Sequence, residues 1–234
     1  MTTLRPSAYS TLFKDGLSAG WPICLGYLPI GLAFGVLAQK AELTPLQIGL
    51  MSVLVFAGSS QFIAVSMLAG GASIVAIIAT TFVVNLRHTL MSSALAVYLR
   101  KRHRGLLALY AYGVTDESFA VNLPRFSDHK WSLSRALVVN HVANFAWFVS
   151  TVSGGICGQY IPEGAFGIDY ALIAMFICLL IYQIRKPIHI MTAVIAGLTA
   201  VGLALVLPGN TYIVIASIFA ATVGVIVQGK LSKT

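Results

Sequence analysis

Polar residues that could do chemistry stand at four places inside otherwise apolar stretches: residues 58–61, 82–90, 110–122 and 182–191. The third place holds the adjacent carboxylates Asp116 and Glu117. Two neighbouring carboxyl groups rarely both ionise in a low-dielectric surrounding, so one of them is a candidate proton carrier. If their segment is instead an interfacial helix, both groups are simply solvated.

The stretch FVVNLRHTL, residues 82–90, places an arginine deep in an apolar run. Arg87 lies about eleven residues before the end of that run, roughly 16 Å at 1.5 Å per residue, too deep for ordinary snorkelling. We expect it either to pair with one of the two carboxylates or to hold an anionic group of a substrate. Asn85 and His88 are three residues apart and share a different face of the same helix.

Gly58, Ser59, Ser60 and Gln61 interrupt the apolar run LVFAGSSQFIAV, residues 54–65. We expect an unwound turn at these four residues, which must line protein or water because lipid cannot satisfy free backbone groups. The half-helix that follows would point its free N–H groups into a cavity, and such helix ends bind carboxylates. The alternative is a continuous helix whose serines bond to its own carbonyls and whose small face packs on a neighbour.

The first apolar run, WPICLGYLPIGLAFGVLA, carries two prolines and several glycines. Pro22 and Pro29 predict a kink or an unwound turn around Tyr27. Gly31 and Gly35 are four residues apart, which predicts a face that packs closely on another helix.

Two further polar groups have plain structural interpretations. Asn140 and Asn144 are four residues apart, so they suit hydrogen bonds between helices as well as a cavity. Arg185 and Lys186, followed by Pro187, are typical of a charged turn between two spans.

The elements that must position these residues are helices in a membrane. Of the 234 residues, 58% are hydrophobic and 9% are charged, whereas a soluble domain carries about 25% charged residues. Since apolar runs recur along the whole chain, we predict an all-α polytopic membrane protein with one domain over residues 1–234. Residues 1–16 are polar and lack the features of a signal peptide, so we expect an N-terminal cytoplasmic tail. The candidate segments are 17–38, 46–69, 72–99, 106–123, 135–158, 168–184, 188–207 and 211–228.

The charge pattern bears on how many segments cross. The net charge is +8, and the basic residues gather between apolar runs, which is typical of cytoplasmic loops rather than of nucleic-acid binding. If all eight segments cross and the N-terminus is inside, the basic cluster at residues 100–104 falls outside. If segments 46–69 and 106–123 both re-enter, six segments cross and every large basic cluster lies inside. We therefore predict six to eight membrane segments, with six or seven crossings favoured and at least one broken or re-entrant helix.

Motifs of catalysis and of cofactor binding are absent from the sequence. It contains no Walker, Rossmann, HExxH or nucleophile-elbow motif, and its three cysteines lack metal-ligand spacing. Ser59, His88 and Asp116 are the residue types of a hydrolase triad, but no spacing specifies one. We therefore expect a transporter and not an enzyme, with no catalytic residue, metal or cofactor. A channel-like protein, a carrier subunit for another small organic solute and, less favoured, an intramembrane enzyme are the alternatives.

Four ordered motifs resemble the AzlC-like family, the large subunits of bacterial branched-chain amino-acid exporters. They are GYLPIGLAFGVLAQKAELTP (26–45), FAGSSQFIAV (56–65), TTFVVNLRHTLMSSALAVYL (80–99) and GVTDESFAV (113–121). The resemblance implies export of leucine, isoleucine, valine or similar amino acids across the inner membrane. It also implies a small AzlD-like membrane subunit as partner and coupling to protons.

The residues and the resemblance together predict a binding site in a secondary transporter that works by alternating access. We expect the amino-acid carboxylate at the half-helix end or at Arg87, and the ammonium or a counter-moving proton at the acidic pair. The side-chain pocket would be lined by Tyr27, Phe56 and Phe62. The substrate-binding candidates are Tyr27, Gly58, Ser59, Ser60, Gln61, Asn85 and Arg87. The proton-coupling candidates are His88, Asp116 and Glu117.

Overall fold

The computed structural model describes residues 6–99, 102–129, 131–162, 187–207 and 211–231, with a few single positions between 170 and 184. This part of the chain is built from helices and contains no strand, which confirms the predicted all-α polytopic membrane protein. Four of the described helices are long and apolar enough to cross a bilayer: Ser10–Lys40, Ile74–Leu99, Leu133–Tyr160 and Pro187–Ala204. The predicted segment 168–184 lies largely, and Arg185 and Lys186 wholly, outside the described residues.

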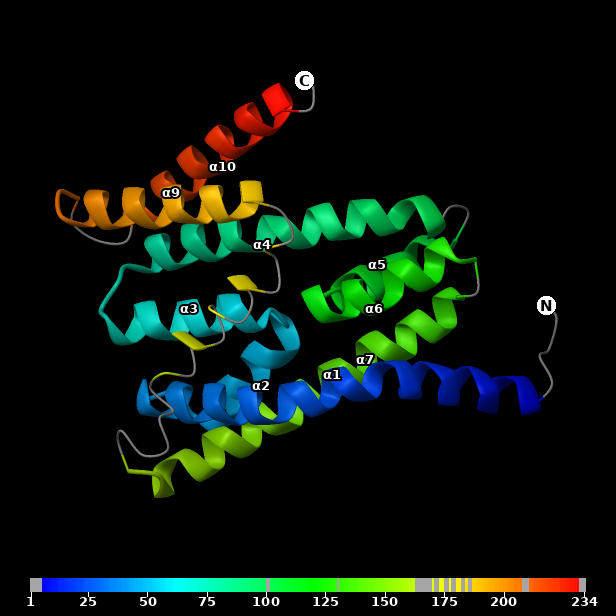
Figure 1. The fold of residues 1–234 in the computed structure, drawn as a ribbon. Coiled ribbons are helices and arrows are strands. Elements are labelled where there is room, and N and C mark those ends of the chain that lie inside the picture. The colour runs from blue at the N-terminus through cyan, green and yellow to red at the C-terminus, as the bar shows by residue number, and fades with distance from the viewer. Residues whose placement is uncertain are drawn as a thin grey trace.

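Helices α1 (Pro6–Lys40) and α7 (Leu133–Cys157) pack on and cross each other along the lower side of the molecule in Figure 1. Gly35 lies so close to α7 that a Cβ atom there would stand 2.1 Å from the carbonyl oxygen of Thr151. On α7, a Cβ at Gly154 would stand 2.2 Å from the carbonyl oxygen of Leu32. The glycines therefore let two backbones touch, which confirms the close-packing face predicted from Gly31 and Gly35.

Helix α1 is continuous through both Pro22 and Pro29, so the unwound turn predicted around Tyr27 is wrong. Each proline removes only one backbone hydrogen bond, and a neighbouring helix in a membrane protein holds such a stretch in place. Here α7 has that role, since Ser150 Oγ donates to the carbonyl oxygen of Tyr27 at 3.3 Å.

Helices α2 (Pro45–Leu54) and α3 (Gly58–Ala69) form a hairpin in which α3 returns to the end where α2 began (Figure 1). The chain does break between half-helices, but at residues 55–57 and not at 58–61, which form the first turn of α3. Small and hydroxyl residues fit the start of a helix, where the backbone N–H groups need no intrahelical partner. The turn itself is made by Phe56, whose φ of +31° is unusual for an aromatic residue.

Helices α5 (Arg104–Tyr112) and α6 (Asp116–Ser127) form a second hairpin, which enters from the opposite end of the molecule (Figure 1). Between the two hairpins runs α4 (Ile74–Ala96), which ends in the short 3₁₀ turn η1 (Val97–Leu99). Thr115 and Ser118 form a capping box that fixes the start of α6. Both segments that the charge pattern singled out therefore return to the side from which they came.

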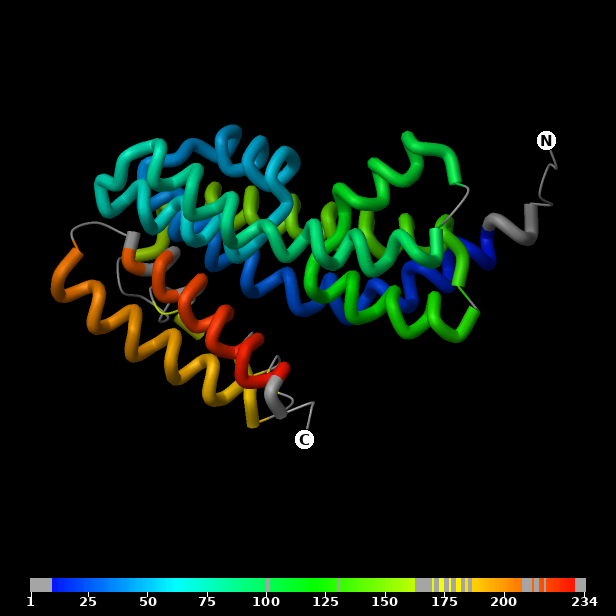
Figure 2. The backbone as a smooth tube through the Cα atoms, turned by 90° about the horizontal axis from the view of Figure 1, so that it is seen from above, coloured from blue at the N-terminus to red at the C-terminus, as the bar shows by residue number. Residues whose placement is uncertain are grey.

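The tips of the two hairpins meet near the middle of the molecule (Figures 1 and 2). The rings of Phe56 and Tyr112 lie 6.1 Å apart, and the Tyr112 hydroxyl donates to the carbonyl oxygen of Val53 at 2.5 Å. The order of one long helix followed by a hairpin thus occurs twice, as α1–α2–α3 and as α4–α5–α6, in opposite directions. Inverted repeats of this kind are common in secondary transporters.

Hydrogen bonds from Asn140 tie α7 to the second hairpin. Its side chain is fully buried, donates to the carbonyl oxygen of Tyr110 at 3.0 Å and accepts from Asn122 Nδ2 at 3.1 Å. Asn144 donates to the Tyr112 hydroxyl at 3.2 Å. Of the two roles predicted for these asparagines, the bonds between helices are confirmed.

Basic residues collect at the end of the molecule where the second hairpin enters. Arg102 and Arg104 precede or begin α5, and Arg125 lies in the last turn of α6. Arg135, near the start of α7, pairs with Asp15 of α1 at 2.8 Å, which brings the start of α1 to the same end. The antiparallel pair α9 (Pro187–Ala204) and α10 (Thr211–Leu231) completes the described fold beside α4 (Figure 1).

Candidate functional site

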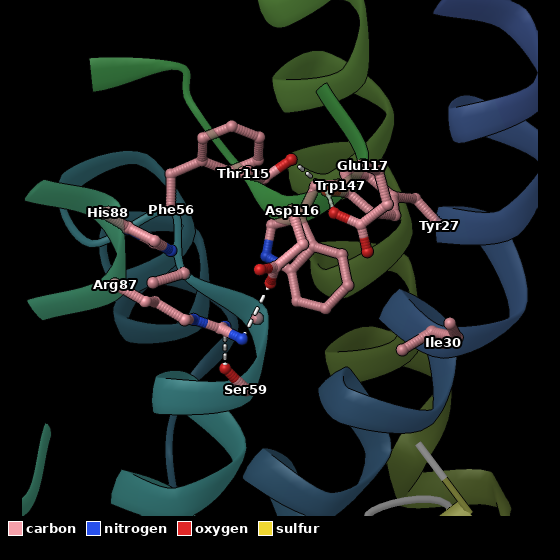
Figure 3. Close-up of a pocket in the computed structure, with 12 residues that line it drawn as sticks. Tyr27, Ile30, Phe56, Ser59, Arg87, His88, Thr115, Asp116, Glu117 and Trp147 are labelled. Atoms are coloured by element: carbon pink, nitrogen blue, oxygen red, sulfur yellow. Dashed lines mark hydrogen bonds and ion pairs between the residues drawn. The ribbon is translucent and has the colours of Figure 1, made fainter. Parts of the chain in front are cut away.

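A cavity of about 140 Å³ lies where the two hairpin tips meet α1, α4 and α7 (Figure 3). The tip of the first hairpin contributes Phe56, Ala57, Gly58 and Ser59. The remaining lining residues are Tyr27 and Ile30 of α1, Arg87 and His88 of α4, Thr115, Asp116 and Glu117 at the start of α6, and Trp147 of α7. The cavity therefore combines both signs of charge with an apolar wall.

The N-terminus of α3 opens into this cavity without a side-chain cap. The residue before the helix is Ala57, whose methyl group accepts no hydrogen bond, and the first intrahelical bond runs from Gln61 N to Ala57 O at 2.9 Å. The N–H groups of Gly58, Ser59 and Ser60 are thus left without intrahelical partners. Together with the positive end of the helix dipole, they favour an anion at this point.

Arg87 joins the tips of both hairpins (Figure 3). Its Nη1 atom lies 2.8 Å from Asp116 Oδ2, and its Nη2 atom donates to Ser59 Oγ. Its Nε atom is buried and has no hydrogen-bond partner among the described residues. The pair with a carboxylate confirms one of the two roles predicted for this arginine, and the free Nε leaves it a donor for a further acceptor.

Glu117 stands on the opposite wall and is held by a different set of bonds. The Tyr27 hydroxyl donates to Glu117 Oε2 at 2.7 Å and lies 2.9 Å from Thr115 Oγ1. Thr115 in turn caps α6 by accepting a hydrogen bond from Ser118 N. The two adjacent carboxylates therefore have different partners, a cation for Asp116 and a neutral phenol for Glu117.

The apolar wall is aromatic, and its central member is Trp147. The indole is 2% exposed, and its Nε1 atom donates to Gln61 Oε1 at 2.8 Å. The rings of Tyr27 and Phe34 lie 5.3 Å and 6.0 Å from the indole. The sequence offered one signal for Trp147 that we missed: it follows Asn144 by three residues, so the two share a helix face.

Seven of the ten predicted site residues line the cavity together: Tyr27, Gly58, Ser59, Arg87, His88, Asp116 and Glu117. The other three lie just behind the wall. Ser60 Oγ donates to Asn85 Oδ1 at 2.5 Å, and Gln61 is fully buried between Ser52 and Trp147. These three side chains hold α3 against its neighbours.

Two further sequence interpretations change with this geometry. Phe62, predicted to line the side-chain pocket, packs against Phe34 with ring centroids 5.2 Å apart and lies outside the cavity lining. Arg87 and His88 line the same cavity, although we expected Arg87 on another side of α4 from His88 and Asn85. Because the cavity is wider than one side chain, two adjacent residues of a helix can both line it. The spacing of residues in the sequence did not indicate this width.

The geometry does not assemble a hydrolase triad from Ser59, His88 and Asp116. A nucleophilic serine needs a hydrogen bond to its base, and the base needs one to its carboxylate. Here Ser59 and Asp116 both bind Arg87 instead. In the part of the chain that the structure describes, no group of three His, Cys, Asp or Glu side chains is placed to hold a metal ion.

The model of the AzlC protein family matches residues 22–161, which include every residue that lines the cavity. The chain belongs to the AzlC family. Each of the four motifs that carry the resemblance contains residues that line the cavity. These residues lie on α1, at the tip of the first hairpin, on α4 and at the start of α6. The chain is accordingly a multi-pass membrane protein of a family with amino-acid transport members.

Several relatives are similar to this AzlC-family chain over most of its length. The branched-chain amino acid transport protein AzlC of Bacillus subtilis is 28% identical over 227 residues, covering 94% of this chain and 87% of that protein. The inner membrane protein YgaZ of Escherichia coli is 28% identical over 210 residues, 86% of each chain. A membrane protein of Archaeoglobus fulgidus is 31% identical over 194 residues, 82% of this chain and 84% of its own. No solved protein structure shows significant similarity to the chain.

Proposed function

We propose that this protein is a secondary transporter that exports branched-chain amino acids across the inner membrane by proton-coupled alternating access. The observation that carries the proposal is the cavity between the hairpin tips, with its anion-binding side, its carboxylates and its aromatic wall. The names of the Bacillus subtilis and Escherichia coli relatives support the substrate class and the membrane.

The cavity is complementary to an apolar amino acid, which carries a carboxylate, an ammonium group and a hydrophobic side chain. The carboxylate would accept hydrogen bonds from the uncapped N-terminus of α3 and from Arg87, whose Nε has no partner among the described residues. The ammonium group would lie against Asp116 or Glu117. The side chain would lie on the wall formed by Ile30, Phe56 and Trp147.

The ion pair of Arg87 and Asp116 would open to receive this substrate. Removing one partner from a buried pair is costly because it leaves an unpaired charge. A zwitterion avoids that cost, since its carboxylate replaces Asp116 at Arg87 and its ammonium replaces Arg87 at Asp116. A ligand with a single charge leaves one partner unpaired, so the pair selects for a molecule that carries both.

Glu117 is the best-placed candidate for the counter-moving proton. Asp116 is paired with the guanidinium of Arg87, whereas the partner of Glu117 is the neutral hydroxyl of Tyr27. Uptake of a proton by Glu117 would also remove one of two negative charges from the ammonium side of the cavity. Binding of the proton and binding of the ammonium would therefore compete, which is the property needed for exchange of one for the other.

Two hairpins that enter from opposite ends and meet at one site support alternating access. Tilting of one inverted repeat against the other would expose the same cavity first to one side and then to the other. The sequence resemblance supports export as the direction of transport. It also supports a small AzlD-like membrane protein as the partner subunit.

Counterflow in proteoliposomes tests the proposal. Vesicles loaded with unlabelled leucine should accumulate labelled leucine, with saturation and with dependence on an imposed pH gradient, whether the protein is reconstituted alone or with its partner subunit. Flux that carries current and does not saturate would indicate a channel. Accumulation of a different solute only would assign another substrate, and hydrolysis without flux would indicate an enzyme.

A further inference from the structure

We propose that Trp147 sets the upper size limit of the transported side chain and that Gly58 keeps open the space beside the indole. This inference rests on the amino-acid transport proposed above and assigns its specificity to named residues. Its basis is that the Trp147 ring is fixed on every side except the one that faces the cavity.

A chain of hydrogen bonds through four side chains fixes the edge of the indole. Trp147 Nε1 donates to Gln61 Oε1 at 2.8 Å, and Gln61 Nε2 donates to Ser52 Oγ at 3.3 Å. Ser52 Oγ lies 2.8 Å from Thr151 Oγ1, and Thr151 stands one helical turn after Trp147 on α7. Since Ser52, Gln61 and Thr151 are all fully buried, these bonds have no competition from water.

Aromatic contacts fix the faces of the indole. Phe34 is stacked at a centroid distance of 6.0 Å with an interplanar angle of 25°. Tyr27 approaches edge-on at 5.3 Å and 70°. A rotation of the indole would have to displace both rings and break the bond to Gln61, so the wall does not adapt to a larger ligand.

Gly58 packs directly against the indole of Trp147. A Cβ atom at Gly58 would lie 3.2 Å from Cη2 and 3.4 Å from Cζ2 of Trp147. A single methyl group there would press on a ring that cannot retreat. The shape of the cavity beside this contact therefore depends on both residues.

The size of the cavity indicates which side chains this wall admits. A cavity of about 150 Å³ holds one benzene-sized molecule, and the present cavity measures about 140 Å³. It must take the carboxylate and ammonium groups as well as the side chain, so a molecule as large as leucine already fills it. We therefore expect the fixed indole to restrict phenylalanine and tryptophan more strongly than compact aliphatic side chains.

Paired substitutions test the inference in proteoliposomes with alanine, valine, leucine and phenylalanine as substrates. Trp147→Phe should raise the phenylalanine-to-leucine rate ratio about tenfold, since a change of one small apolar group in a pocket is worth 10- to 200-fold. Gly58→Ala should lower the leucine-to-alanine ratio by about the same factor. The double variant should bring leucine transport back toward the wild-type ratio, because the methyl group gains the space that the smaller ring releases.

Trp131→Phe is the matched control, because Trp131 bonds to Asn122 and lies outside the cavity lining. It should leave both ratios unchanged. Gln61→Leu keeps the buried volume but removes the hydrogen bond to the indole. It should therefore also raise the phenylalanine-to-leucine rate ratio, which tests the inference even if Trp147→Phe does not fold. Leucine should also change the tryptophan fluorescence of wild type and Trp131→Phe but not that of Trp147→Phe.

Two outcomes separate the inference from the function on which it rests. If wild type transports leucine but Gly58→Ala and Gln61→Leu slow all four substrates equally, Trp147 is not a size limit and the proposed function stands. If wild type accumulates no amino acid, the proposed function itself is wrong.

Discussion

Arg87 touches one side chain at the tip of each hairpin, Ser59 of α3 and Asp116 of α6. Charged side chains this deep in a membrane protein occur where a partner or a substrate repays their desolvation. In the function proposed above, one group would serve both purposes: the pair with Asp116 joins the two hairpin tips, and the same atoms would meet the substrate. At the residue scale, stability and binding would therefore compete for one guanidinium.

A pair of substitutions tests the structural half of this role. Arg87→Ala should destabilise the protein by about 1–2 kcal/mol, since it leaves Asp116 unpaired in a partly buried site. The double variant Arg87→Ala/Asp116→Ala should recover more than half of that loss while remaining inactive. Thermal unfolding in detergent measures both values, and a double variant no more stable than Arg87→Ala would contradict the pairing.

The two carboxylates should separate proton coupling from substrate exchange. Asp116→Asn should weaken leucine exchange at equal pH as much as transport driven by a pH gradient, because it removes the partner of Arg87 and of the substrate ammonium. Glu117→Gln should weaken transport driven by the gradient more than exchange, because Glu117 has no cationic partner among the described side chains. The measurement is leucine flux against pH with and without the gradient. A pH dependence unchanged in both variants would remove both residues as proton carriers.

The sequence predicted these charged residues well and the aromatic wall poorly, for a physical reason. A charged group in an apolar run is expensive and therefore informative, so Arg87, Asp116 and Glu117 were identifiable without a structure. A tryptophan in an apolar run is ordinary, and the helix face that Trp147 shares with Asn144 is a weak local sign that it does not face lipid. Its role depends on Gln61, which is 86 positions away in the sequence.

At the scale of elements, glycine has opposite effects at different places in this fold. In α1 and α7 it brings two helices into backbone contact, and at position 58 it keeps a helix start free of side chains. Propensity predicted a break at each cluster of glycine and proline. The break formed only at residues 55–57, where two half-helices end against other elements, while the packing of α1 on α7 overrode both prolines.

Two alanine substitutions on α1 should therefore change the free energy of unfolding differently. Gly35→Ala places a methyl group against the carbonyl of Thr151 and should cost about 1–3 kcal/mol through overpacking. Gly26→Ala meets no atom within 4 Å and should be neutral or should stabilise α1 by up to about 1 kcal/mol. Unfolding of the two variants in parallel checks the difference, and equal destabilisation would argue against the close crossing.

At the scale of the whole molecule, the repeats α1–α3 and α4–α6 run in opposite directions (Figure 2), and the tip of each hairpin contributes residues to one cavity. The charge pattern predicted that at least one of the segments 46–69 and 106–123 re-enters, because the basic clusters all share a side if both do. No pattern in the sequence predicted that the two hairpin tips meet. Their meeting depends on contacts such as that of Phe56 with Tyr112, which lie in different repeats.

The basic residues at the end where the second hairpin enters predict which loops face the cytoplasm. In a background without native cysteines, Arg102→Cys should react with a membrane-impermeant maleimide only after the cells are opened. Glu42→Cys, beyond the other end of α1, should react in intact cells. Labelling of position 102 in intact cells would overturn the six-crossing arrangement.

The three walls of the cavity also have a consequence for handedness. In the proposed transporter, the N-terminus of α3, the carboxylates at the start of α6 and the fixed indole of Trp147 would contact three different substituents of one carbon atom. A mirror-image amino acid can satisfy two of these walls but must turn its side chain away from the third. Because none of the three can exchange places with another, the transporter should distinguish L-leucine from D-leucine by its architecture alone.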